Sequence, residues 1–346
     1  MSDTKIVFPA EWHPQQAIQL TWPHHKSDWN YLLNEVERCY VDIAVEIAKR
    51  QHLIIACFDT NHVSTLLQHA KIENISFFET ESNDTWARDH GGITVLENGT
   101  PVIYDFCFNG WGKKFNAELD NTITRNLFKQ GAFDAYRYVD MNYFVLEGGS
   151  IESDGCGILL TTEQCLLSAK RNDKFSKNEI ELQLRKSFGV KQIHWLKNGY
   201  LAGDDTDSHI DTLARFCNPA SIAYVKCDDK NDEHYEALSA MERELHELKQ
   251  LNGMPYQLFP LPMAEAVYDS DDGHRLPATY ANFLIMNEII LFPIYNLASD
   301  QKAIEAISPA FPDKKIVPVD CSVLIRQHGS LHCITMQYPA PPVQIL

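Results

Sequence analysis

A sequence pattern typical of a helix followed by a strand recurs along this chain and constrains its fold more than any other feature. Apolar residues fall on one helical face in several segments, and a short apolar run typical of a strand follows these segments. We expect helices at 32–47, 177–188, 232–249 and 299–308, and strands at 53–58, 192–196 and 316–319. The pattern predicts an α/β protein.

Five polar clusters run directly into strand-like residues, and their spacing is nearly even. One marker from each cluster gives gaps of 58, 62, 73 and 51 residues. The markers are Asp89, Glu147, His209, Asn282 and Cys333. Repeats of this length are typical of ββαβ-type modules around an axis, each adding polar residues at a strand end. We therefore expect a fivefold pseudo-symmetric α/β propeller, with an open doubly wound sheet as the alternative.

Length and charge limit the organisation and the partners of the chain. A chain of 346 residues can form one large domain, and no Gly/Ser linker or low-complexity tract divides it. We expect a single domain over 1–346, with the acidic run 268–273 as a loop inside it. The net charge of −17 disfavours nucleic acid and anionic membranes. It fits a small cationic substrate, although solubility is the more ordinary explanation.

Cysteine usage and missing motifs exclude several classes of protein. Nine cysteines without any C-x-x-C pair argue against a disulfide framework and a zinc ribbon. The first residues lack a signal-peptide pattern, and no apolar run is long enough for a membrane span, so we expect a cytoplasmic protein. Nucleotide-binding loops, the serine-hydrolase elbow and the zincin motif are all missing. We expect no cofactor and no metal.

Cys333 follows a glycine-led turn and precedes a β-rich stretch, so it is a candidate nucleophile at a strand end. Neighbours on a strand face opposite ways, which makes His332 a poor candidate for its base. His209 and Asp211 are two residues apart, and on an extended segment both would face one pocket. His209 could then move protons while Asp211 binds a cation. A solvated acidic turn is the alternative for 204–207.

Two further clusters fit a cation pocket. Trp86 could pack against a flat guanidinium, and Asp89 could accept its paired N–H donors. A buried tryptophan beside a surface Arg88–Asp89 pair is the alternative. After Glu147, two glycines precede a strand, as in many turns and bulges, and Gly148 could also let a substrate approach the backbone closely.

Together these stretches resemble the agmatine deiminases and the bacterial-type peptidylarginine deiminases, within the guanidino-group-modifying penteins. The matching stretches follow one another in order over nearly the whole chain. They are N-D-T-W-A-R-D-H-G at 83–91, F-N-G-W-G at 108–112, L-E-G-G-S-I at 146–151, D-D-T-D-S-H-I-D at 204–211 and H-G-S-L-H-C-I-T at 328–335. The set is highly specific, although no single stretch is.

The resemblance implies the fivefold propeller and a role for eight residues. It implies Cys333 as the nucleophile, His209 as general acid and base, Asp89 and Asp211 as guanidinium-binding carboxylates, Glu147 as the support of His209, Asp205 as a further substrate contact, and Trp86 and Trp111 as pocket walls. Two departures affect the substrate rather than the reaction. Family members that act on agmatine tend to have T-D-G-H and G-G-N-I-H-C, where this chain has Ser208 and His328.

The resemblance also implies a reaction. Cys333 would attack the guanidinium carbon, and His209 would protonate the departing ammonia. Water would then hydrolyse the amidino-cysteine, giving N-carbamoylputrescine from agmatine, a step of polyamine biosynthesis. The carboxylates should raise the pKa of Cys333. The alternative functions, in order of preference, are a peptidylarginine deiminase, an amidinotransferase, and a non-enzymatic binding protein with an inert Cys333. The sequence leaves homo-oligomerisation open.

Overall fold

The computed structural model describes residues 4–68 and 72–341, and its five larger sheets share one pairing pattern. In each sheet a middle strand pairs antiparallel with one neighbour and parallel with the strand that follows it after a helix. The expected ββαβ modules are therefore present in a mixed α/β fold. Their fivefold arrangement around an axis stays a prediction.

The strands are short and mostly buried. The sheets, in order of pairing, are β1 (Ile6–Val7), β5 (Ile93–Glu97), β6 (Thr100–Cys107) and β7 (Arg137–Val145); β10 (Gln192–Leu196), β9 (Ile158–Thr162) and β8 (Ile151–Ser153); β11 (Ala214–Asn218), β12 (Ser221–Lys226) and β13 (Gln257–Pro262); β16 (Leu284–Ile285), β17 (Ile289–Ile294) and β18 (Lys315–Asp320); and β19 (Thr335–Pro339), β2 (Gln15–Thr21), β3 (His52–Cys57) and β4 (Ile75–Glu79). The expected loop 268–273 is the turn of a hairpin between β14 (Val267–Tyr268) and β15 (Arg275–Leu276).

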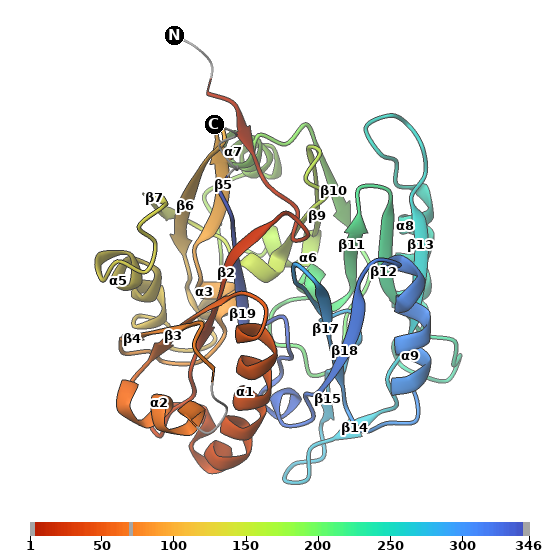
Figure 1. Ribbon diagram of the computed structural model, residues 1–346. Coiled ribbons are helices and arrows are strands. Elements are labelled where there is room, and N and C mark those ends of the chain that lie inside the picture. Colours follow the sequence, from red (N-terminus) through yellow and green to blue (C-terminus); the bar gives the residue numbers. More distant parts are fainter. Residues whose placement is uncertain (1–3, 69–71, 342–346) are drawn as a thin grey trace.

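Helices connect the parallel strand pairs, and the four expected ones are confirmed. The α-helices of the described ranges are α1 (Leu33–Ala48), α2 (Thr60–Gln68), α3 (Ala87–His90), α4 (Gly110–Lys113), α5 (Ile123–Lys129), α6 (Glu163–Leu166), α7 (Lys177–Phe188), α8 (Tyr235–Glu247) and α9 (Asp300–Ile307). The four expected ones are α1, α7, α8 and α9. Figure 1 shows α5 and α9 at opposite outer edges of the molecule, with β2 and β19 between them. No helix in the described ranges is long and apolar enough to cross a membrane.

Local sequence explains where these helices lie. On α1, Val36, Tyr40, Ile43 and Ile47 share one face and are fully buried, and burial of such a side chain contributes about 1.5–3 kcal/mol. Helix α7 begins at a reciprocal capping box between Ser176 and Glu179. It ends at a glycine in the left-handed region, with φ 65°.

The two ends of the described chain close one sheet. Strand β19 pairs antiparallel with β2, which lies more than 300 residues earlier, with Thr335 opposite Leu20. Each marker cluster precedes a strand of a different sheet, since β5, β8, β11, β16 and β19 follow the five markers in turn. The fold thereby delivers polar residues from every module.

A buried ionic network ties several modules together. The fully buried Arg215 guanidinium donates from Nη2 to Glu11 Oε2 at 2.5 Å and from Nε to Glu152, and its Nη1 donates to the Phe283 carbonyl at 2.6 Å. Glu11 also lies 2.8 Å from His332 Nε2. These partners come from strands or loops of different sheets, so the network fixes how the sheets meet.

We expect Arg215→Met to lower the free energy of unfolding by about 3–5 kcal/mol, because Glu11 and Glu152 would stay buried without their cation. Urea denaturation measures this change. The control is Arg137→Met, which removes a guanidinium that is 59% exposed and pairs with Glu97, and it should cost less than about 1 kcal/mol. Equal losses in the two variants would contradict a special role for Arg215.

Candidate functional site

Cys333 lies on the wall of a pocket with an empty volume of about 500 Å³, which includes its open mouth. Four of the five matching stretches contribute to this wall. The lining residues are Asp28, Asp84, Trp86, Asp89, Trp111, Phe115, Asp204, Asp205, Thr206, Thr212, Gln327, His328, Gly329 and Cys333. The structure thus brings residues from four distant stretches of the sequence to one pocket.

The pocket wall is strongly acidic. Five of its described lining residues are aspartates, and the described lining includes no lysine and no arginine. Aromatic rings from Trp86, Trp111 and Phe115 provide flat apolar surface beside these carboxylates. Such a wall attracts cations and repels anions, and a planar cation can also stack on the rings.

Asp89 projects into the site from the short helix α3. Its Oδ1 accepts a hydrogen bond from the Gly149 N–H at 3.0 Å, and its Oδ2 accepts one from Trp111 Nε1 at 2.9 Å. Burial raises the pKa of Asp89 well above its usual value, and the nearby Asp211 and Glu147 carboxylates raise it further. Asp89 is therefore held in place but lacks a cation.

Asp211 has the opposite electrostatic character. Burial alone would raise its pKa, but the hydrogen bond and charge of His332, with smaller contributions from His209 and Arg215, lower it below the usual value. Asp211 Oδ2 lies 2.7 Å from His332 Nδ1, while Oδ1 is buried and has no hydrogen-bond partner among residues 4–68 and 72–341. This free oxygen is available to a bound N–H donor.

Cys333 is buried and held by an amide. Its Sγ donates to Asn282 Oδ1 at 3.3 Å, and the same oxygen accepts the His332 N–H at 2.9 Å. Burial raises the pKa of the Cys333 thiol well above its usual value, and Asp211 and Asp89 raise it further, as the sequence argument expected. The thiol is therefore protonated at neutral pH.

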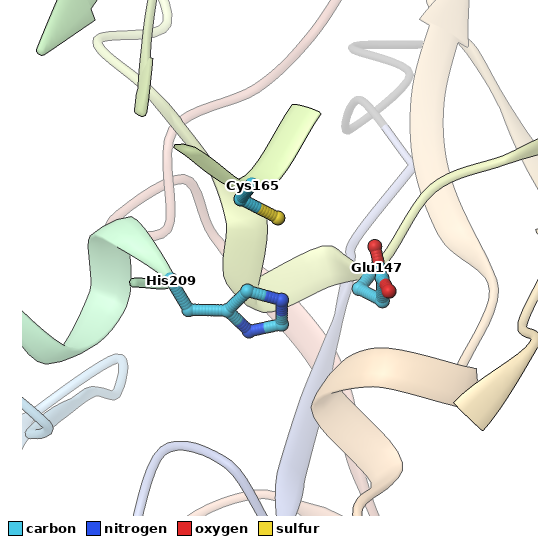
Figure 2. Close-up of side chains that lie close together, drawn as sticks. All are labelled: Glu147, Cys165 and His209. Carbon is cyan, nitrogen blue, oxygen red and sulfur yellow. The ribbon is translucent and has the colours of Figure 1, made fainter. Parts of the chain in front are cut away.

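His209 is 1% exposed, and its two ring nitrogens face different surroundings. Nδ1 lies 3.5 Å from Asp89 Oδ1, whereas Nε2 has no hydrogen-bond partner in the described part of the chain. Burial lowers the pKa of His209 to about 3, so the ring is neutral at physiological pH. In Figure 2 the ring points toward the side chains of Glu147 and Cys165.

The Glu147 carboxylate is hydrogen-bonded to Arg171, so it cannot serve His209 alone. The buried Arg171 Nε donates to both carboxylate oxygens, at 2.9 and 3.0 Å. Its Nη1 and Nη2 donate to Asp207 and to the Thr206 carbonyl, at 2.6 and 2.8 Å. Burial raises the pKa of Glu147, and the Arg171 charge offsets part of this rise. Arg171 thus links Glu147 to the loop that carries His209.

The loop before His209 is strained, and so is the turn before Cys333. Asp207, Ser208 and His328 have φ values of 66°, 64° and 66°, in the left-handed region. Glycine adopts this conformation without strain, whereas Ser208 and His328 each carry a Cβ. His328 Nδ1 donates to the Gly203 carbonyl at 2.7 Å, which anchors the two strained segments to each other.

The expected extended segment at His209 and Asp211 was wrong, because Ile210–Thr212 is a 3₁₀ helix. Cys333 lies in a turn just before β19, as expected, but strand alternation does not apply to His332 and Cys333 because both lie in that turn. The side chains still converge, since a Cβ on Gly149 would lie within about 3 Å of His209 Nδ1, Asp89 Oδ1 and Asp211 Oδ2.

Gly148 faces backbone rather than the pocket. A Cβ there would meet the Arg88 carbonyl oxygen at 2.2 Å, so the position serves close packing, and it is Gly149 that faces the site. Arg88 does not pair with Asp89 either. Its Nε donates to the His332 carbonyl at 3.5 Å, and its side chain is 4% exposed.

Sequence reasoning missed Arg171, Cys165 and the structural use of Asn282. Arg171 and Cys165 lie in a polar stretch that matches none of the recognised motifs. Asn282 was noted only as a spacing marker, but its amide holds the backbone and thiol of Cys333. Its place in the even spacing was the one signal that could have pointed to this role.

A further buried carboxylate, Asp120, positions the loop that carries the Trp86 and Asp89 side chains. Its Oδ1 accepts the Asn83 and Asp84 N–H groups at 2.7 and 3.1 Å. Burial raises the pKa of Asp120 to about 8, and the Asp84 charge contributes. The folded protein therefore holds a proton on this group at neutral pH.

Comparison with known proteins agrees with this geometry. A family model described as Porphyromonas-type peptidyl-arginine deiminase matches residues 7–339. The chain belongs to this family. A relative from Marinomonas sp. (strain MWYL1), provisionally named an agmatine deiminase, is 32% identical over 96% of this chain and 94% of its own length.

Solved structures are similar over nearly the whole chain. A Porphyromonas gingivalis protein, provisionally described as an arginine deiminase, is 50% identical, with a TM-score of 0.90 over 97% of this chain and 99% of that one. A cysteine-to-serine variant of the C. jejuni agmatine deiminase with substrate bound is 39% identical, with a TM-score of 0.91 over 99% and 98%. The predicted family is confirmed, while the names of these proteins differ in substrate.

We expect Asp120→Asn to remove a pH dependence of stability. The folded pKa of about 8 lies above the usual value of 3.8, so the stability that Asp120 contributes is complete below pH 3.8 and is lost as pH rises through 8. The corresponding slope is about −1.4 kcal/mol per pH unit between these values. The amide oxygen of the variant can still accept both N–H groups.

Urea denaturation at pH 5, 6, 7 and 8 checks this prediction. The stability of Asp120→Asn relative to the unmodified protein should rise steadily with pH. The control Asp313→Asn removes an exposed carboxylate and should show no such trend. A constant difference between Asp120→Asn and the unmodified protein would rule out a buried, protonated Asp120.

Proposed function

We propose that this protein hydrolyses agmatine to N-carbamoylputrescine and ammonia. The observation that carries the proposal is the acidic pocket around Cys333, with five aspartates and no lysine or arginine among its described lining residues. Agmatine carries a guanidinium at one end and an ammonium at the other, so both ends are attracted. Free arginine carries an α-carboxylate, which this wall would repel without offering it a cationic partner.

Binding is the first step of the proposed mechanism. The guanidinium enters between Asp89 and Asp211, where the free Asp211 Oδ1 and the Asp89 carboxylate accept its N–H donors. Trp86 and Trp111 wall the pocket, and Asp205, with a side chain 41% exposed, contacts the outer part of the substrate. The bound charge offsets the repulsion between the carboxylates and stabilises the Cys333 thiolate.

Covalent chemistry follows from this arrangement. Cys333 Sγ forms a bond to the guanidinium carbon, and the proton of the thiol passes to His209 Nδ1. The tetrahedral adduct breaks its C–N bond when the His209 imidazolium donates that proton to the departing nitrogen, which leaves as ammonia. Glu147 stabilises the imidazolium from the Nε2 side. An amidino-cysteine remains.

Water completes the cycle. His209 takes a proton from a water molecule, which attacks the amidino carbon and forms the new C–O bond. The C–S bond then breaks, the ureido product leaves, and Cys333 recovers a proton. The proposal includes a role for this product in polyamine biosynthesis. It also includes a fivefold arrangement of the modules within a single domain over 1–346.

Ammonia release measured side by side from agmatine, free arginine, an arginine-containing peptide and methylated arginines tests the substrate. Agmatine should have the highest kcat/KM, and free arginine should be at least about tenfold poorer, since each 1.4 kcal/mol of repulsion is a factor of ten. Cys333→Ala should release no ammonia from any of them. A higher kcat/KM for the peptide would replace agmatine with peptidylarginine as the substrate.

We also expect Arg171 to act as a positioning residue. In Arg171→Met the buried Glu147 loses its cation, its pKa rises further, and it becomes protonated, so it no longer stabilises the His209 imidazolium. The value of kcat should fall by about 10²-fold, within the range of general acid–base catalysis. Arg171→Lys should recover part of it.

The pH profile of kcat separates this role from a purely structural one. Arg171→Met should shift the pH optimum upward, because Glu147 must be ionised to work. The control is Arg185→Met, which removes a guanidinium 38% exposed on the surface of α7. An Arg171→Met enzyme with an unchanged pH profile would refute the coupling to Glu147.

A further inference from the structure

Cys165 lies behind the proposed catalytic groups and takes no part in the mechanism above. Its sulfur, one nitrogen of His209 and one oxygen of Glu147 all lie within 4.8 Å of one another. Figure 2 shows the three side chains directed at a common point from different segments of the chain. All three residues are buried, with exposed fractions of 0%, 1% and 0% for Cys165, His209 and Glu147.

His209 supplies the observation that points to a ligand. Its Nε2 is buried and has no hydrogen-bond partner among the residues that the structure describes, while Nδ1 lies 3.5 Å from Asp89 Oδ1. When an ion binds, the single proton of the neutral ring lies on Nδ1, beside the Asp89 carboxylate, and the lone pair of Nε2 faces the ion. This carboxylate–histidine arrangement is the one that orients metal-binding histidines in proteins.

Glu147 and Cys165 have the donor atoms that match this nitrogen. Arg171 Nε contacts both Glu147 oxygens on one side, which fixes the carboxylate and leaves other lone pairs available. A thiolate, an imidazole and a carboxylate are ligands of zinc, whereas Ca²⁺ and Mg²⁺ require several oxygen ligands. Ligand atoms at about 2.0–2.3 Å from a tetrahedral zinc lie about 3.3–3.8 Å apart. The three atoms lie within 4.8 Å of one another, so small side-chain shifts would bring them to these distances.

We propose that Glu147, Cys165 and His209 form an inhibitory site for a divalent cation of the zinc class. The ion binds Glu147 through an oxygen, Cys165 through Sγ and His209 through Nε2, with a fourth position open to water. Cys165 releases its proton to solvent as the ion binds, so the site gains one negative charge to balance the cation. Affinity should therefore rise with pH.

Occupancy would stop the catalytic cycle at His209. A cation on Nε2 prevents that nitrogen from carrying a proton, so the imidazolium that protonates the leaving ammonia cannot form. It also takes Glu147 away from His209. The inhibition rests on the proposed function, but the binding of the ion does not, and the two can be measured separately.

Binding is tested with Co²⁺ as a spectroscopic probe of the purified full-length protein. The unmodified protein should bind one Co²⁺ and show a near-ultraviolet thiolate-to-cobalt charge-transfer band. Cys165→Ser and Cys165→Ala should lose the band. Two controls should keep it: Cys217→Ser, which changes a buried free cysteine outside the cluster, and Cys333→Ser, which removes the proposed nucleophile.

Inhibition is tested with Zn²⁺ at buffered free concentrations. Cys165→Ser should keep basal ammonia release within about threefold, while the Zn²⁺ concentration for half-inhibition should rise by about 100-fold, since even outer partners of a metal ligand change affinity 10- to 100-fold. Cys217→Ser should be inhibited like the unmodified protein.

Three results would overturn the site. They are a failure of the unmodified protein to bind Co²⁺, a charge-transfer band that persists in both Cys165 variants, and a band lost in Cys333→Ser but kept in Cys165→Ser, which would place the ion on the nucleophile. If the protein releases no ammonia from any guanidine but Co²⁺ binds through Cys165, the metal site stands and only the proposed function fails.

Discussion

The buried carboxylates Asp89 and Asp211, close to the Cys333 thiol, are the constraint on which the rest of the site depends. Like charges in a low-dielectric interior repel strongly, and none of these groups has a cation within the pocket wall. The surroundings supply partial compensation. Asp89 accepts two N–H donors, and Asp211 is paired with His332. A bound guanidinium can supply the positive charge that these groups still lack.

Holding these groups in place requires unusual backbone geometry. Ser208 and His328 occupy the left-handed region, which costs on the order of 1–2 kcal/mol for a residue with a Cβ. Hydrogen bonds hold the Ser208 segment on both sides. Asp204 accepts the Ser208 N–H at 2.8 Å, and the Thr162 hydroxyl donates to the Ser208 carbonyl, also at 2.8 Å. The strain is therefore carried by the same loop that presents His209, and the ion pairs of Arg171 resist its relaxation.

The sequence predicted the helices and strands well, because amphipathic periodicity and apolar runs depend on local burial. It also predicted which clusters meet, since Asp89 and Cys333 line one pocket and His209 lies beside Asp89. The premise for His209 and Asp211 failed, because their convergence comes from a 3₁₀ turn rather than from strand alternation. Their spacing gave the right outcome for a wrong reason.

Arg171 shows why other parts of the site could not be read from sequence. The sequence does not distinguish a buried arginine from an exposed one. The role of Arg171 depends on its ion pairs with carboxylates 24 and 36 residues away in the chain. Cys165 is similar, because one of nine cysteines becomes distinctive only through its neighbours in space. Pairings that arise from tertiary contacts leave no periodic trace.

The opposite pKa directions of Asp89 and Asp211 suggest an order of events in the proposed mechanism. Asp211 is ionised because His332 supports its charge, and its Oδ1 has no partner among the described residues, so in the proposed mechanism it receives the guanidinium first. Asp89 and Cys333, whose pKa values burial raises, can ionise only when that cation is in place. The thiolate would then form only in the presence of its substrate, so that a fixed charge on one carboxylate controls the reactivity of the thiol.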